Sequence, residues 1–460
     1  MQEPADDALQ LPLLGGPSDG ATACPRGASV PQTCAIVLNI FVGLGLLSMP
    51  FAVMKGGWVA LIALGLLVPL FAASGQLICL SFEMMPGGMP RTYANLGAAA
   101  AGSAGRNAVL LFSCCELFGA TLVTLMICWQ MLELLLPSEG IGPLHPNQLA
   151  ALLSCAVLLP LLFIDLRRLS RFSLLGSLST AVVVCLVLAL LAIDPQRSAM
   201  PQQPPPPRHV ASLGLVQSLG IFALSCSAHT TLPALRSAMA KPSRFPAALA
   251  ASFGIMAACY GTVAAAGYWY WGDSSSPLVT TDLAVNSAYT FSRVPVDRLL
   301  AVFVLVSALT KYPALNMVLQ DMILSATPVR RDSLGNARAP LPWVERALRL
   351  TLFAAAVLLA LTVYSSLGSV LSLVGGLCSL TCSLLLPTAF YTLLAWERLS
   401  WPSRLSLSAL VVLSVSLIAL TTASSLAELT SSDHSAPAPV AAGGSGSSSW
   451  GALSPLLSHS

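Results

Sequence analysis

The sequence contains little charge. Only 9% of its 460 residues are Asp, Glu, Lys or Arg, whereas 55% are hydrophobic and the mean hydropathy is +0.78. Soluble domains carry about 25% charged residues, so this composition excludes a soluble fold and indicates an integral membrane protein. The net charge of +3 and the lack of a long basic cluster also exclude nucleic acid as a partner.

Three further features are missing. No Lys or Arg stands before Arg26, so the N-terminus lacks the basic start of a cleaved signal peptide. All of the twelve cysteines except Cys24 lie in or beside apolar runs, which indicates packing residues rather than disulfides or metal ligands. No loop gathers Asp, Glu and His, so there is no general acid/base pair, and we expect no catalytic residue, metal or cofactor.

The chain instead has apolar runs long enough to cross a bilayer. We predict a transmembrane domain at 33–430 between a disordered cytosolic tail, 1–32, and a flexible Ala/Ser/Gly-rich tail, 431–460. Two connections stand out, a stiff proline-rich spacer at 195–211 and a basic loop at 326–343. The eleven predicted spans are 33–54, 58–83, 107–136, 148–164, 172–193, 212–235, 246–271, 296–325, 344–364, 367–395 and 403–426.

The first span contains residues that break helices. Gly43, Gly45, Ser48 and Pro50 fall within eight positions of an otherwise apolar run. A helix broken there leaves free backbone groups at membrane depth, where only protein or a bound ligand can satisfy them. Interrupted helices of this kind hold substrates and ions in secondary transporters. The alternative is a proline kink with glycines that allow close helix packing.

The sixth span repeats this pattern. The small polar residues Ser225, Cys226 and Ser227 precede His229 and then Pro233. The two interrupted spans are the first of two five-helix sets, which indicates an inverted-repeat transporter of 5+5 helices plus one extra helix.

Three ionisable residues lie within predicted spans: Glu116 in the third, His229 in the sixth and Lys311 in the eighth. A charge at the bilayer centre costs about 2.5–3.5 kcal/mol on insertion scales, so these residues are functional candidates. The alternatives are a structural ion pair for Glu116 and Lys311, and for His229 a core histidine bound to a backbone carbonyl.

Several motifs together resemble the amino acid/auxin permease family, and within it the vacuolar amino acid transporters, over about residues 33–430. The first span is similar to the family's glycine-rich opening, and the third carries a Glu-containing segment that includes Glu116. One difference is Ala228, where the family usually has Gly, so we expect the sixth span to break earlier, at 225–227. The matching motifs are VGLGLLSMPFAVMKGGW at 42–58, CELFG at 115–119, Ser227-x-His229 with Pro233, Ser237, Met239 and Phe245, GYWYWG at 267–272, Thr310-Lys311-Tyr312, and SLVGG at 372–376 with Pro387.

This resemblance implies an all-α LeuT-type fold, amino acid substrates and coupling to protons. We therefore interpret the chain as a secondary active transporter of amino acids, in a vacuolar or other endomembrane. A sensor of the same fold is the alternative, and a membrane-embedded transferase enzyme is less well supported. The expected substrate-binding residues are Gly43, Leu44, Gly45, Ser48, Ser225, Ser227 and His229.

For proton coupling the sequence offers Glu116 and Lys311. In LeuT-type folds the first and eighth spans can hold a sodium ion, and the Lys311 ammonium could take the place of that ion. Our hypothesis is that Glu116 carries the proton and that Lys311 is its fixed partner.

The distribution of Lys and Arg predicts the topology. With the N-terminus in the cytosol, 16 of the 22 basic residues lie on the cytosolic side, five lie opposite and Lys311 lies within a span. A reporter fused after Ser460 should therefore be reached only from the lumen or outside, and one placed before Met1 only from the cytosol. Cytosolic access to the reporter after Ser460 would contradict the span count.

Overall fold

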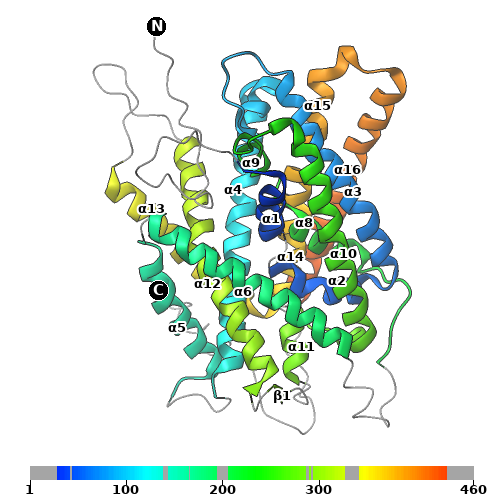
Figure 1. Cartoon of the computed structure of the whole chain (residues 1–460). Coiled ribbons are helices and arrows are strands. Elements are labelled where there is room, and N and C mark those ends of the chain that lie inside the picture. Colours follow the sequence, from blue (N-terminus) through cyan, green and yellow to red (C-terminus); the bar gives the residue numbers. More distant parts are fainter. Residues whose placement is uncertain are drawn as a thin grey trace.

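The apolar runs form helices in the computed structural model, and these helices pack side by side into a bundle (Figure 1). The structure describes residues 28–41, 44–137, 143–164, 166–193, 206–285, 290–291, 294–326 and 341–432.

The first half of the chain supplies the predicted spans one to six. It begins with α1, which starts three residues before the expected 33, and continues through one 3-10 segment. The elements are α1 (Val30–Phe41), η1 (Leu44–Ser48), α2 (Met49–Gly56), α3 (Val59–Glu83), α4 (Tyr93–Leu135), α5 (Pro146–Leu161), α6 (Leu166–Ile193), α8 (Leu215–Cys226) and α9 (Leu232–Ser237).

The second half is also helical apart from one short antiparallel strand pair. Within it, η5 and η6 are π-helical segments. The elements are η2 (Pro242–Arg244), α10 (Phe245–Trp271), η3 (Gly272–Ser274), α11 (Val279–Val285), β1 (Thr290–Phe291), β2 (Val294–Pro295), α12 (Val296–Ala326), α13 (Pro342–Val363), η4 (Tyr364–Ser366), α14 (Leu367–Val374), η5 (Gly375–Ser379), η6 (Thr381–Leu385), α15 (Leu386–Ala395), η7 (Trp396–Arg398) and α16 (Trp401–Ser432).

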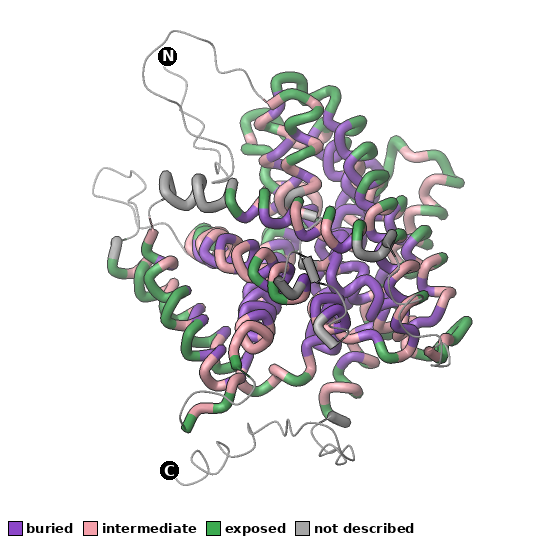
Figure 2. Tube along the Cα trace, turned by 60° about the horizontal axis from the view of Figure 1, so that its bottom comes forward, coloured by how far each residue is buried: buried purple, intermediate pink, exposed green. Residues whose placement is uncertain are grey.

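The outer surface of the bundle is apolar. Ile62 and Leu66 of α3 and Leu358 of α13 are large hydrophobic residues with 65%, 65% and 66% of their surface exposed. Figure 2 shows buried residues along the inner faces of the helices and exposed residues on their outer faces. Such outward apolar faces need lipid around them, so the class of helical membrane protein is confirmed.

The predicted count of eleven spans stays a prediction. Among the described residues, six helical stretches are long and apolar enough to cross a membrane by length and composition. The predicted first and sixth spans consist of shorter helices, and the ninth and tenth run together in the single stretch Trp343–Arg398.

Helix α4 differs from the predicted third span, because it begins at Tyr93 rather than at 107. Ala101 and Gly102 have non-helical backbone angles, and the φ of Gly102 is +61°. Gly97 and Gly105 touch across this kink, since a Cβ added at Gly97 would lie 2.6 Å from the Gly105 carbonyl oxygen. Residues 93–106 are mostly Ala and Gly and form no strongly apolar run, so the sequence did not mark this helical segment.

The proline-rich connection is described only from 206 onward. There it lies against the turn between α2 and α3, where the Trp58 N–H donates to the His209 carbonyl oxygen at 3.2 Å. The imidazole Nε2 of His209 lies 2.8 Å from a carboxylate oxygen of Asp273, in η3. This segment therefore joins the ends of three helices on the side that the basic residues predict to be lumenal or external.

Helix α16, the predicted extra helix, packs against α14 and both π-helical segments. The Ser425 hydroxyl lies 2.7 Å from that of Ser372 in α14. A Cβ added at Gly376 of η5 would lie 2.4 Å from the Thr421 hydroxyl of α16, so η5 and α16 are in close contact.

Candidate functional site

The interruptions of the first and sixth predicted spans meet inside the bundle. Helix α8 ends at Cys226, and Ser227 has an extended backbone with φ −89° and ψ 126°. A Cβ added at Gly45 of η1 would lie 2.6 Å from the Ser225 hydroxyl and 2.8 Å from the Ser225 Cβ. Only a glycine at 45 permits this approach, so the two predicted breaks are in direct contact.

Ser48, the last residue of η1, and Ser225 carry groups that are relevant to a ligand. The Ser48 hydroxyl is buried and has no hydrogen-bond partner among the described residues. An unpaired buried hydroxyl is costly unless something else binds it. The Ser225 carbonyl accepts from the Tyr260 hydroxyl at 3.1 Å, and the Ser225 hydroxyl donates to the Ile221 carbonyl at 2.9 Å.

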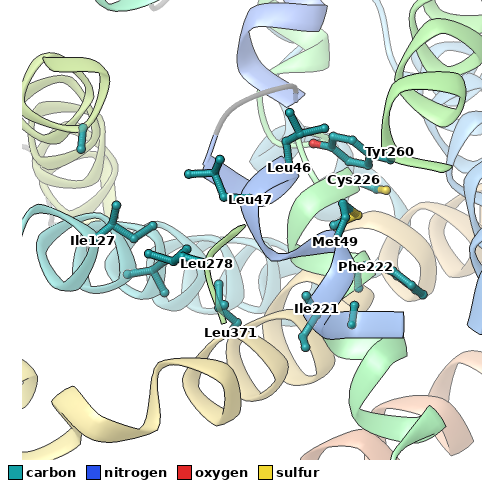
Figure 3. Packing of buried hydrophobic residues seen from close by; sticks show 14 of the residues in the cluster. Leu46, Leu47, Met49, Ile127, Ile221, Phe222, Cys226, Tyr260, Leu278 and Leu371 are labelled. Carbon is teal, nitrogen blue, oxygen red and sulfur yellow. The ribbon is translucent and has the colours of Figure 1, made fainter. Parts of the chain in front are cut away.

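Apolar side chains surround the contact. Figure 3 shows Leu46, Leu47 and Met49 near Cys226 and Tyr260, and all of these residues are fully buried or nearly so. Of the other predicted substrate-binding residues, Gly43 lies outside the described residues, and Leu44 is the first residue of η1.

Glu116 lies in the interior of the bundle and accepts a hydrogen bond from a serine hydroxyl. The Ser227 hydroxyl donates to Glu116 Oε1 at 2.5 Å, and the Ser227 and Ser383 hydroxyl oxygens are 2.6 Å apart. Ser379 and Cys382 also lie near the carboxyl group. Two predicted residues from different spans, Glu116 and Ser227, are therefore brought together.

The π-helical segment η6 supplies backbone acceptors to the same region. A π turn breaks the regular helical hydrogen-bond pattern and is frequent at functional sites. The Cys382 carbonyl accepts from the Tyr93 hydroxyl at 2.6 Å, and the Ser383 carbonyl accepts from the Ser74 hydroxyl at 2.5 Å. Side chains from α4 and α3 thus fix the distorted part of the predicted tenth span.

His229 makes the contact expected of a core histidine. Its Nε2 lies 2.9 Å from the Phe71 carbonyl oxygen and 3.0 Å from the Ser74 hydroxyl. Its ring packs edge-on against the Phe71 ring, with the centroids 5.6 Å apart. Nδ1 is buried without a partner among the described residues, an arrangement that suits a neutral ring whose Nε2–H donates to Phe71. His229 therefore attaches the segment after α8 to α3.

Lys311 does not meet Glu116. Its ammonium nitrogen is buried and has no hydrogen-bond partner among the described residues, and no ion pair joins it to the carboxylate. The neighbouring Thr310 packs on α6, where a Cβ added at Gly176 would lie 2.0 Å from the Thr310 hydroxyl. The structure therefore offers Ser227, and not Lys311, as the direct partner of Glu116.

Three residues of this region were missed by the sequence reasoning: Ser74, Tyr260 and Ser383. For Ser383 a signal existed, because Ser379, Thr381, Cys382 and Ser383 form a small polar run inside an apolar span. That run is similar to the one that identified the sixth span. The described residues contain no group of three or more His, Cys, Asp or Glu that could hold a metal ion.

Comparison with solved structures defines the class. The fold is similar to that of MhsT, solved in complex with L-phenylalanine, with a TM-score of 0.52 and 13% sequence identity over 89% of this chain and 98% of that one. This likeness shows that the two chains share a helical membrane fold. The chain belongs to the transmembrane amino acid transporter protein family, whose sequence profile matches residues 26–427.

Individual relatives agree with this assignment. The amino acid transporter AVT1B of Arabidopsis thaliana is 29% identical over 381 residues, which are 82% of this chain and 66% of that protein. The human vesicular inhibitory amino acid transporter is 23% identical over 387 residues, 79% of this chain and 69% of that protein. The chain thus spans about two thirds of the length of these relatives. They are transporters, so the resemblance is confirmed and the enzyme alternative is set aside.

The contact between Gly45 and Ser225 gives a test. Gly45→Leu should abolish amino acid transport while leaving the protein inserted, and Gly45→Ala should be milder. Overpacking costs about 1–3 kcal/mol, so we expect Gly45→Ala to lower the midpoint of thermal unfolding and Ser225→Gly to restore part of it.

The matched control is Gly65→Ala in α3, where an added Cβ meets nothing within 4 Å. It should leave the unfolding midpoint and transport unchanged. Normal transport by Gly45→Leu would show that the glycine is a packing residue away from the substrate.

Proposed function

We propose that this chain is a secondary active transporter that moves amino acids by alternating access and is coupled to protons. Family membership and the LeuT-type fold support the transport of amino acids. The observation that carries the proposal is the contact of Gly45 with Ser225. In the same segment η1, the buried Ser48 hydroxyl has no hydrogen-bond partner among the described residues. Eleven spans, with the first and sixth broken, are part of the proposal.

The substrate would lie between the two interruptions. Its carboxylate would accept from backbone N–H groups at Gly43, Leu44 and Gly45, where a helix start favours negative charge. Its ammonium would donate to backbone carbonyls around Ser225 and Ser227, and Ser48 would supply a hydroxyl.

His229 acts in this proposal as a support for the site rather than as a direct ligand. Its Nε2 is taken by the Phe71 carbonyl and by Ser74, so the ring fixes the backbone that follows Ser227. This position would keep the backbone carbonyls around Ser225 and Ser227 directed at the substrate.

Glu116 is the proton carrier of the proposal. It is a carboxylate in the interior of the bundle, within reach of Ser227 at the interruption. It would load a proton while one side is open to water and release it while the other side is open. Lys311 would act separately, as a fixed cation where LeuT-type transporters can hold sodium.

The membrane that fits best is an internal one. The relatives include a transporter described as vesicular, and the resemblance to vacuolar transporters points the same way. The alternative function is an amino acid sensor of the same fold, which would bind its ligand without net uphill flux.

Replacement of Glu116 tests the proton step. Glu116→Gln keeps the shape but cannot titrate, so we expect it to abolish pH-driven accumulation of amino acid in proteoliposomes and to spare exchange at equal pH. The control is Glu133→Gln on the same helix, where the amide can still accept from the Tyr364 hydroxyl.

Glu133→Gln should accumulate substrate as the unmodified protein does. If Glu116→Gln also concentrates substrate against its gradient, the proton travels by another route, and His229 is the next residue to test.

A further inference from the structure

Three predicted spans meet at Glu116. The carboxylate comes from α4, the Ser227 hydroxyl from the interruption after α8, and the Ser383 hydroxyl from the π-helical segment η6. The oxygen–oxygen distances are 2.5 Å from Glu116 to Ser227 and 2.6 Å from Ser227 to Ser383. The three side chains therefore form a continuous hydrogen-bonded chain.

The direction of this chain depends on the proton of Glu116. An ionised carboxylate only accepts hydrogen bonds, whereas a protonated one also donates. With Glu116 ionised, Ser227 donates to it, and Ser383 must donate to Ser227. With Glu116 protonated, its O–H can donate to Ser227, which then donates to Ser383. The Ser383 hydrogen must then find a different acceptor, so the change at Glu116 reaches η6.

The surroundings of Glu116 support this role for the hydroxyls. The titratable side chains that face the carboxyl group are Tyr93 of α4, Cys378 of η5 and Cys382 of η6. None of them is a cation. Among the described residues the carboxylate therefore accepts from the Ser227 hydroxyl and not from a cation, and hydrogen bonds to a charged group are the stronger kind.

Segment η6 also holds the interruption at a second point. The Ser383 carbonyl accepts from Ser74, and Ser74 lies 3.0 Å from Nε2 of His229. Ser227 and His229 stand on either side of Ala228, so η6 is connected to both flanks of the non-helical segment. A shift of Ser383 would move these two connections together.

We propose that Ser227 and Ser383 are positioning residues that convert protonation of Glu116 into movement of the segment between α8 and α9 against η6. This inference rests on the proposed proton coupling and assigns the coupling to the predicted tenth span. The Ser227 and Ser383 hydroxyls are not ligands of the substrate and do not carry the proton. They determine the position of the segment between α8 and α9 in each protonation state of Glu116.

The test uses Ser227→Ala and Ser383→Ala in the full-length protein, reconstituted in proteoliposomes with a panel of radiolabelled amino acids. We expect each variant to lower pH-driven accumulation by roughly tenfold or more. Ser227→Ala removes a hydrogen bond to a charged group, and Ser383→Ala removes the hydroxyl that binds Ser227. In Ser383→Ala, exchange at equal pH should stay within about threefold of the unmodified protein. In both alanine variants the dependence of uptake on pH should flatten, because the chain no longer transmits the charge of Glu116. The double variant should lose no more than the worse single variant, since both residues act in one chain.

Two further variants separate coupling from folding. Ser227→Thr keeps the hydroxyl at a half-buried position and should restore accumulation and the pH profile. Thr381→Val in η6 removes a hydroxyl that donates only to its own helix, at the Leu377 carbonyl, and should behave as the unmodified protein.

Each outcome decides the proposal. If both alanine variants accumulate substrate and depend on pH as the unmodified protein does, while Glu116→Gln is inactive, the inference is overturned. The proposed function then remains intact. If the alanine variants lose exchange and accumulation equally, and Ser227→Thr does not restore them, the two serines have a purely structural role. That result would also overturn the inference. If the unmodified protein does not respond to a pH gradient, proton coupling fails and the inference fails with it.

Discussion

The structure depends on one constraint: lipid offers no hydrogen-bond partner to an interrupted helix. Every backbone or hydroxyl group freed at membrane depth must therefore be bound by protein or by ligand. Here neighbouring helices supply most of the partners, as when Tyr260 binds the Ser225 carbonyl and Ser74 binds that of Ser383. The Ser48 hydroxyl has no such partner among the described residues, and it belongs to η1, the segment whose Gly45 contacts Ser225.

The large elements could be predicted from sequence because the same constraint marks them. Long apolar runs predicted the helices. Gly45 falls in the 3-10 segment η1, and Pro233 falls at the start of α9, just after the non-helical residues that follow α8. The family resemblance, based on motifs such as the one around Glu116, is confirmed by the match over residues 26–427. What could be predicted was therefore local, and it followed from composition and from residues that break helices.

Contacts between distant segments could not be predicted in this way. Lys311 and Glu116 are the ionisable pair that a search by charge selects, yet the structure joins Glu116 to Ser227 instead. Serine is common in membrane helices, so Ser74 does not stand out by type, and Ser383 is marked only by the small polar run around it. Nothing in the sequence of η6 indicates its π-helical geometry. The partner of His229 is a backbone carbonyl, which every residue has. Such partners depend on which helix faces turn toward one another, and the spacing of residues along the chain does not determine those faces.

The central claim is that the interruption holds an amino acid whose uphill movement is driven by protons. The most direct measurement is uptake of a panel of amino acids into proteoliposomes with an imposed pH gradient, with and without a sodium gradient. The account predicts that at least one amino acid accumulates against its gradient when the pH gradient is present, and that sodium changes nothing. Uptake that only equilibrates the substrate, or accumulation that requires sodium, would contradict it.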